Sequence, residues 1–146
     1  MITEQLSQAL SIAAAPIHPQ SVSAGTADTG GVDASKFRRV LFVLDVGAFG
    51  ASATVDMKLQ ESADNSTFTD IAGAAITQLA AAGGNNRLAT LEIRAGQLSA
   101  GKRYVRARVT VGTAATTLQC LALGGEAVDK PGSANDVAAV AQRLVV

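Results

Sequence analysis

The composition of this 146-residue chain argues against a nucleic-acid-binding protein, a disulfide-stabilised secreted protein and a membrane-spanning protein. Its 12 basic and 12 acidic residues give a formal net charge of zero, so no overall field attracts nucleic acid or an anionic membrane. The single cysteine cannot form an intrachain disulfide, no apolar run reaches the ~18 residues of a transmembrane helix, and residues 1–15 lack the early Lys or Arg of an export signal. We therefore expect one intracellular domain.

Residues 1–36 are predicted to form an N-terminal arm. Pro16, Pro19 and several glycines are spread among Ser, Thr and Ala, a composition typical of irregular or extended backbone. A short helix can form over residues 4–13, and the remainder is either an extended arm or an edge strand.

Residues 37–125 carry the patterns of β-strands and are predicted to form the body. Residues 40–46 are almost entirely apolar, which indicates a strand covered on both faces. In VDMKLQESADNSTFTDIAG, residues 55–73, apolar and polar residues alternate, give way to a polar cluster, and alternate again. This pattern predicts an antiparallel hairpin with a loop of about four or five residues.

Further alternating segments lie within residues 87–96, 102–112 and 116–125. Strands separated by turn signals at this spacing predict an all-β antiparallel sandwich or barrel, and no strand–helix alternation supports a parallel sheet. Residues 126–146 are predicted to form a C-terminal tail, in which Asn135 caps a short helix and the last residues are apolar.

Residues suited to catalysis or metal binding are scarce. His18 is the only histidine and lies in the proline-containing arm, and Cys120 sits in a strand on an apolar face with no second cysteine. Asp64 and Asp70 flank the hairpin turn and could hold a calcium ion, but turn formation is the favoured role. We therefore expect no catalytic residue, no metal site, no cofactor, no small-molecule substrate and no enzymatic activity.

Two kinds of surface are candidates for binding a protein partner. Strand alternation places Tyr104, Arg106 and Arg108 on one sheet face; such a face could meet nucleic acid, but a protein partner or solvent fits a neutral chain with one tyrosine better. Apolar residues of the two flanks are the other candidates, because apolar side chains near a chain end usually pack on something. The predicted partner-binding residues are Ile12, Ile17, Tyr104, Arg106, Arg108, Val137, Val140, Leu144, Val145 and Val146.

The runs FRRVLFVLDVGAFGASATVDMKLQESADNSTFTDIAGAAITQL, GKRYVRARVTVG and LGGEAVDKP resemble small virion proteins of tailed bacteriophages, the head decoration or cement proteins. The resemblance spans about residues 20–132 and is most specific in the hairpin that begins at Gln60. It implies a jelly-roll-like β-sandwich that forms a homodimer or homotrimer.

The same resemblance implies a protein made in the host cytoplasm that binds the outer capsid surface and cements neighbouring subunits of the major capsid protein. The zero net charge adds the expectation of no nucleic acid and no membrane as partner. A phage tail or head–tail-joining protein and a stand-alone β-sandwich binding module are the alternatives.

Overall fold

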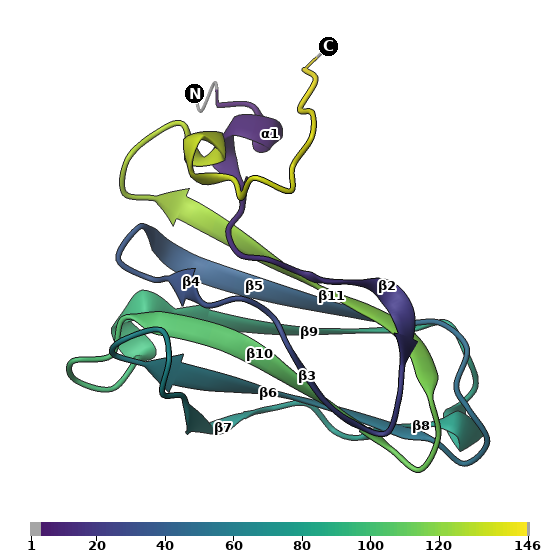
Figure 1. The fold of residues 1–146 in the computed structure, drawn as a ribbon. Coiled ribbons are helices and arrows are strands. Elements are labelled where there is room, and N and C mark those ends of the chain that lie inside the picture. Colours follow the sequence, from purple (N-terminus) through teal and green to yellow (C-terminus); the bar gives the residue numbers. More distant parts are fainter. Residues whose placement is uncertain (1–3, 146) are drawn as a thin grey trace.

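Two antiparallel sheets pack face to face as a β-sandwich in the computed structural model, which describes residues 4–145 (Figure 1). The five-stranded A sheet contains β1 (Ser11–Ile12), β2 (Ile17–Val22), β5 (Phe37–Val46), β9 (Arg87–Arg94) and β11 (Thr116–Ala127). The six-stranded B sheet contains β3 (Gly25–Asp28), β4 (Val32–Asp33), β6 (Thr54–Ser62), β7 (Thr69–Ala75), β8 (Leu79–Ala80) and β10 (Tyr104–Gly112). The helical elements are short: α1 (Leu6–Ala9), η1 (Ala81–Gly83), η2 (Ala95–Gln97) and η3 (Gly132–Asn135).

The order of the eight main strands is that of a jelly roll. Counted along the chain from β2, the first strand pairs with the last, β3 pairs with β10, β5 pairs with β9, and β6 pairs with β7. Successive pairs lie alternately in the A and B sheets, so the chain resembles one long hairpin folded into two layers. The predicted all-β, jelly-roll-like sandwich is therefore confirmed, and so is the hairpin, which is formed by β6 and β7.

The core lies between the two sheets because the inward-facing positions of the strands are apolar. Burial alternates along β5 and β10, and the inward-facing Phe42 and Val109 are fully buried. Cys120 of β11 joins this core, with its Sγ 3.9 Å from the Sδ of Met57 on β6.

Burial makes the Cys120 thiol unreactive. It raises the pKa of the thiol to about 12, and the thiolate is the form that attacks. We expect a thiol reagent such as DTNB to leave Cys120 unlabelled in the folded protein and to titrate one thiol after denaturation. The matched control is Ala63→Cys, whose thiol would stand on an exposed loop and react at once. Equal labelling rates at the two positions would contradict the burial of Cys120.

The prediction that residues 40–46 form a strand covered on both faces is wrong for one face. Val40 and Phe42 point into the core, whereas Leu41 and Val43 lie half-buried on the outer face of the A sheet. An apolar run therefore has a second cause: in a two-layer sandwich it can also arise when the outer face of a strand carries apolar side chains.

Much of the N-terminal segment forms edge strands, which was one of its two predicted structures, the other being an extended arm. Within residues 4–145, β2 pairs with β11 alone in the A sheet, and β3 pairs with β10 alone in the B sheet. An edge position tolerates Pro19, and the register between β2 and β11 shifts beside it. The short helix expected over residues 4–13 is confirmed only for the four residues of α1.

The predicted C-terminal helix capped by Asn135 does not form. η3 ends at Asn135, and the described residues that follow contain no helix. Asp136 accepts a hydrogen bond from the backbone N–H of Ile12 at 2.8 Å and contacts two nitrogens of the Arg143 guanidinium. These bonds hold the tail beside β1 in place of helical hydrogen bonds. The two ends of the chain thus meet as a small unit beyond one end of the sandwich (Figure 1).

Candidate partner-binding surfaces

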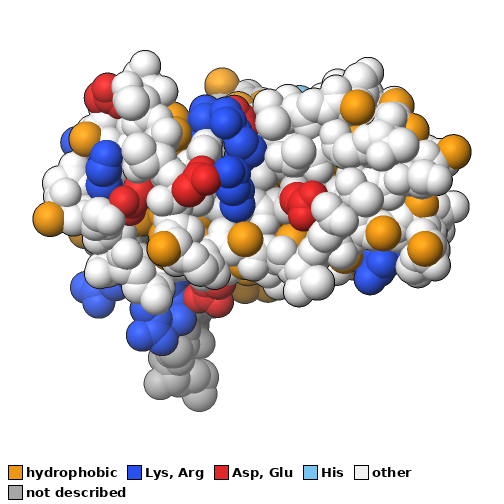
Figure 2. Space-filling model, turned by 90° about the horizontal axis from the view of Figure 1, so that it is seen from below, with side chains coloured by type: hydrophobic (Ala, Val, Ile, Leu, Met, Phe, Trp, Pro, Cys, Tyr) orange, Lys and Arg blue, Asp and Glu red, His pale blue; other side chains and the backbone are white. Residues whose placement is uncertain are grey.

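The predicted residues Tyr104, Arg106 and Arg108 lie on the outer face of the B sheet, because the residues between them on β10 point into the core. Figure 2 looks onto the molecule from the side of this sheet and shows basic side chains gathered in a band with acidic side chains beside them. The face is therefore charged and of mixed sign.

The arginines of this face are already paired within the chain. Arg108 donates hydrogen bonds to both carboxylate oxygens of Asp28, at 2.7 and 2.8 Å. Arg106 donates to Gln60 Oε1 at 2.9 and 3.0 Å, lies 3.2 Å from Asp28, and stacks 4.0 Å from the centroid of the Phe68 ring. An acidic group of a partner would have to compete with these contacts.

The carboxylates of this region are held in their charged form. Hydrogen bonds from Arg108 lower the pKa of Asp28, and hydrogen bonds from Lys58 and then Gln60 lower the pKa of Asp70. The pKa of Asp64 is lowered mainly by the backbone N–H groups of Thr67 and Ser66. Asp64 therefore fixes the hairpin turn, the role favoured from the sequence.

These shifts predict a loss of stability in acid. An Asp in the unfolded chain has a pKa of about 3.9, above its folded pKa, so the stabilisation is complete above about pH 4 and is lost as the pH falls through the folded pKa values. We expect the midpoint of urea unfolding to be flat between about pH 5 and 7 and to decrease steadily from about pH 4 to 2. Asp28→Asn should weaken this dependence, and a midpoint unchanged down to pH 2 would contradict it.

Three predicted flank residues are engaged in contacts within the molecule. Ile17 is only 4% exposed and belongs to the core, so it cannot contact a partner without unfolding β2. Ile12 is half-buried in β1, and its carbonyl accepts a hydrogen bond from the N–H of Val137 at 3.0 Å. Ile12 and Val137 therefore join the two ends of the chain.

The last predicted residues are more accessible. Val140 is half-buried at a turn, Leu144 is 73% exposed and Val145 is 41% exposed. Val146 lies outside the described residues. The tail therefore still presents apolar side chains to a partner.

A surface that the sequence analysis missed lies on the outer face of the A sheet. Leu41 and Val43 of β5 stand directly opposite Leu123 and Leu121 of β11, and all four side chains are half-buried. We call these four residues the outer apolar stripe. The stripe itself carries no charge, which distinguishes it from the outer face of the B sheet, where paired charges dominate.

Polar pairs border the outer apolar stripe at both ends. At one end Arg39 bonds to Glu92 and Glu126, each at 3.1 Å, and at the other Gln119 bonds to Asp45 at 3.2 Å. Such an apolar centre with a polar border is the usual anatomy of a protein interface.

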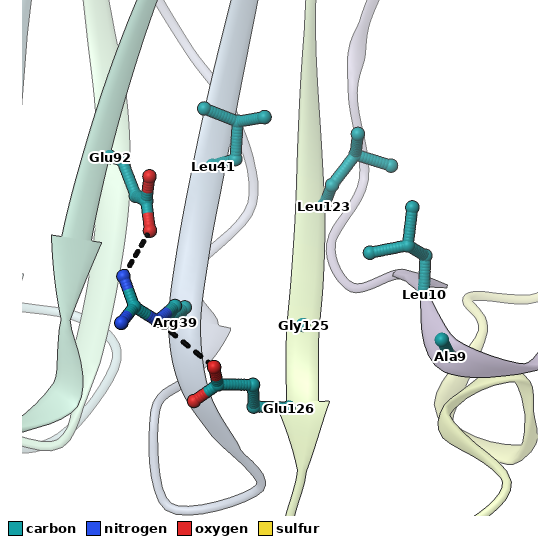
Figure 3. A pocket seen from close by; sticks show the side chains of 8 residues that line it. All are labelled: Ala9, Leu10, Arg39, Leu41, Glu92, Leu123, Gly125 and Glu126. Carbon is teal, nitrogen blue, oxygen red and sulfur yellow. Dashed lines mark hydrogen bonds and ion pairs between the residues drawn. The ribbon is translucent and has the colours of Figure 1, made fainter. Parts of the chain in front are cut away.

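The stripe continues at its arginine end into a shallow groove of about 360 Å³ (Figure 3). Leu41 and Leu123 form its floor, the side chain of Leu10 approaches from the α1 side, and Arg39 closes the opposite wall. The groove is lined mainly by apolar atoms and holds no cluster of nucleophilic or metal-binding side chains.

The sequence did contain a signal for this surface. In the middle of β5 and β11 the outward positions Leu41, Val43, Leu121 and Leu123 are leucine or valine, where a sandwich strand normally carries polar residues. The apolar run of residues 40–46 therefore marks an unusually apolar outer face and not a strand covered on both faces.

The described residues contain neither a metal-binding cluster nor a membrane-spanning helix. No group of three or more His, Cys, Asp or Glu residues among them could hold a metal ion. In the same part of the chain, no helix is both long and apolar enough to cross a membrane.

Comparison with known proteins adds a family and a fold. The Bbp16 family model matches residues 6–121, which include most of both sheets. The chain belongs to the Bbp16 family. No curated protein matches this Bbp16-family chain significantly.

Among solved structures, the crystal structure of the PBSX exported protein XepA matches the Bbp16-family chain with a TM-score of 0.57 and 18% sequence identity. The match covers 88% of this chain and 40% of XepA, so the chain spans less than half of the length of XepA. At this identity the likeness shows a shared fold. The family indicates a phage-related protein and does not single out head decoration.

Proposed function

We propose that this Bbp16-family protein is a structural virion protein that binds the outer surface of a bacteriophage capsid and ties neighbouring major-capsid subunits together. The observation that carries the proposal is the outer apolar stripe, an apolar face on a rigid sandwich whose other face is neutralised by its own ion pairs. The proposal assigns no catalytic step and no cofactor to the chain.

The physical basis is the burial of the stripe against the coat. Apolar surface gains roughly 25 cal/mol per Å² when it is removed from water, and a standard interface covers about 800 Å² on each partner. A shell offers many identical sites, so even weak single contacts are strengthened when an oligomer binds several of them at once. A homodimer or homotrimer is therefore part of the proposal.

The exposed tail gives the protein a second contact. Leu144 and Val145 are exposed, and the C-terminal segment that carries them extends beyond the end of the sandwich (Figure 1), where it can reach a coat subunit next to the one under the stripe. A rigid body on one subunit and a tail on its neighbour together describe a clamp. The family and the phage-related neighbour support a virion role for such a clamp.

Cryo-electron microscopy of the native particle tests the assignment. Many copies ordered on the outside of the head, with the A sheet facing the coat, are the expected result. A ring of copies in the tail or at the head–tail joint would replace it with the tail alternative, and absence from the particle would favour a stand-alone binding module.

A further inference from the structure

The groove at the arginine end of the outer apolar stripe opens where one strand position lacks a side chain. Leu121, Leu123 and Gly125 occupy successive outward-facing positions of β11. Gly125 lines the groove together with Leu41 and Leu123, so the leucine series ends where the groove begins (Figure 3). The missing side chain leaves the apolar floor uncovered.

Neither the backbone nor the packing requires glycine at position 125. The φ angle of Gly125 is not positive, so this residue does not use the left-handed conformation that favours glycine. Its own chain neighbours aside, a Cβ placed there would have one atom within 4 Å, the Cδ2 of Leu10 at 3.6 Å, which is ordinary contact. Glycine inside a strand weakens the strand and often marks a place where a ligand or another backbone approaches closely. Gly125 therefore leaves room for a group from another molecule.

The two chain ends fix one wall of this groove. Ala9 and Leu10 form the wall. η3 packs so closely behind it that a Cβ at Gly132 would lie 2.9 Å from the carbonyl oxygen of Ala9. The guanidinium of Arg143 also donates a hydrogen bond to the carbonyl oxygen of Ser7. The wall is thus already in place in the folded chain, and a ligand binds without the cost of ordering it.

The opposite wall determines the charge that a ligand should carry. Arg39 donates to the Oε1 atoms of Glu92 and Glu126, each at 3.1 Å (Figure 3). The Oε2 atoms of both carboxylates have no hydrogen-bond partner among the described residues. Two carboxylates and one guanidinium leave the lining with an excess of negative charge, since Arg94, which stands opposite Arg39 in the sheet, does not line the groove. This wall favours a positively charged hydrogen-bond donor.

We propose that the groove binds a segment of the major capsid protein in which a large apolar side chain stands close to a lysine or arginine. The apolar side chain rests on the floor above Gly125, and the basic group bonds to the free oxygens of Glu92 and Glu126. A protein segment fits better than a small molecule, because the groove is shallow and continues into the outer apolar stripe, so one partner covers both. This inference rests on the proposed function and adds the chemistry that the coat must present.

Filling the groove tests the inference. Gly125→Leu places a side chain in the space assigned to the apolar group and leaves the core face of β11 untouched. In co-sedimentation with expanded capsid shells, we expect Gly125→Leu to bind at least about tenfold more weakly than the unchanged protein and Gly125→Ala to be intermediate. Thr110→Leu, the matched control, adds the same side chain to the outer face of the B sheet and should bind normally. Urea unfolding verifies that each variant is folded.

Removing the two carboxylates tests the basic group of the ligand. Glu92→Gln/Glu126→Gln should weaken binding about fivefold and reduce its dependence on salt, because the attraction to a cation is lost. Asp129→Asn, the control, removes an exposed carboxylate that does not line the groove and should change neither quantity. Unchanged binding by the double variant would overturn the requirement for a lysine or arginine.

Failure of this inference and failure of the proposed function give different results. If the unchanged protein does not bind shells, the proposed function is contradicted and the inference falls with it. If the unchanged protein and folded Gly125→Leu bind equally well, the groove is not a capsid contact, although the proposed function stands. Analytical ultracentrifugation without shells provides the remaining check: a different oligomeric state for Gly125→Leu would assign the groove to a second copy of the chain and overturn the inference.

Discussion

Replacing Phe42 with alanine is expected to lower the free energy of unfolding by about 3–5 kcal/mol. Phe42 is fully buried at the middle of β5, where its ring fills the space between the two sheets. Removing the ring loses the free energy gained by burying it away from water. It also leaves a cavity that the paired strands cannot close. Urea unfolding followed by circular dichroism measures the loss.

The adjacent residue of the same strand gives a matched control. Val43 points to the outer face and is half-buried, so Val43→Ala should cost less than about 1.5 kcal/mol. Equal losses for Phe42→Ala and Val43→Ala would contradict the assignment of inner and outer faces to β5.

Gly124→Val is expected to destabilise the fold by about 1–3 kcal/mol, because it overpacks the core. Gly124 lies on the buried face of β11, and a Cβ placed there would be 2.6 Å from two atoms of the Phe37 ring. Phe37 is itself 2% exposed, so its ring cannot move aside without disturbing other core side chains. The free energy of unfolding again measures the effect.

Substitution of the neighbouring Gly125 is the control. It distinguishes crowding at Gly124 from a general intolerance of larger side chains in β11. A Cβ at Gly125 would lie 3.6 Å from the Cδ2 of Leu10, which is ordinary contact. Gly125→Val should therefore leave stability within about 1 kcal/mol of the unchanged protein. If the Gly125 variant lost as much stability as the Gly124 variant, the packing of Phe37 against Gly124 would not explain the result.

Local patterns predicted most of the body. Alternation along β6 and β10 defined strands because each has a core face and a more polar outer face. The N-terminal strands β2 and β3 were harder to recognise, because an edge strand needs partners on one side only and so tolerates Pro19. The tail was mispredicted because the long-range bonds of Asp136 outweigh the weak helical propensity of a short segment.

The candidate surface was harder to predict than the fold. Sequence alternation placed Arg106 and Arg108 on one face, but their neutralisation by Asp28 depends on the pairing of β10 with β3, strands about eighty positions apart in the chain. The outer apolar stripe likewise requires β5 and β11 to lie side by side. Surfaces assembled from distant strands become visible only when the topology is known.

Co-sedimentation of the purified protein with expanded capsid shells tests attachment through the outer apolar stripe most directly. The stripe variant Val43→Asp/Leu121→Asp places two charges on directly opposite residues, and the control Thr110→Asp places one on the outer face of the B sheet. We predict that the stripe variant remains folded and binds shells at least about tenfold more weakly, while Thr110→Asp binds like the unchanged protein. Unchanged binding by the folded stripe variant would contradict attachment through this face.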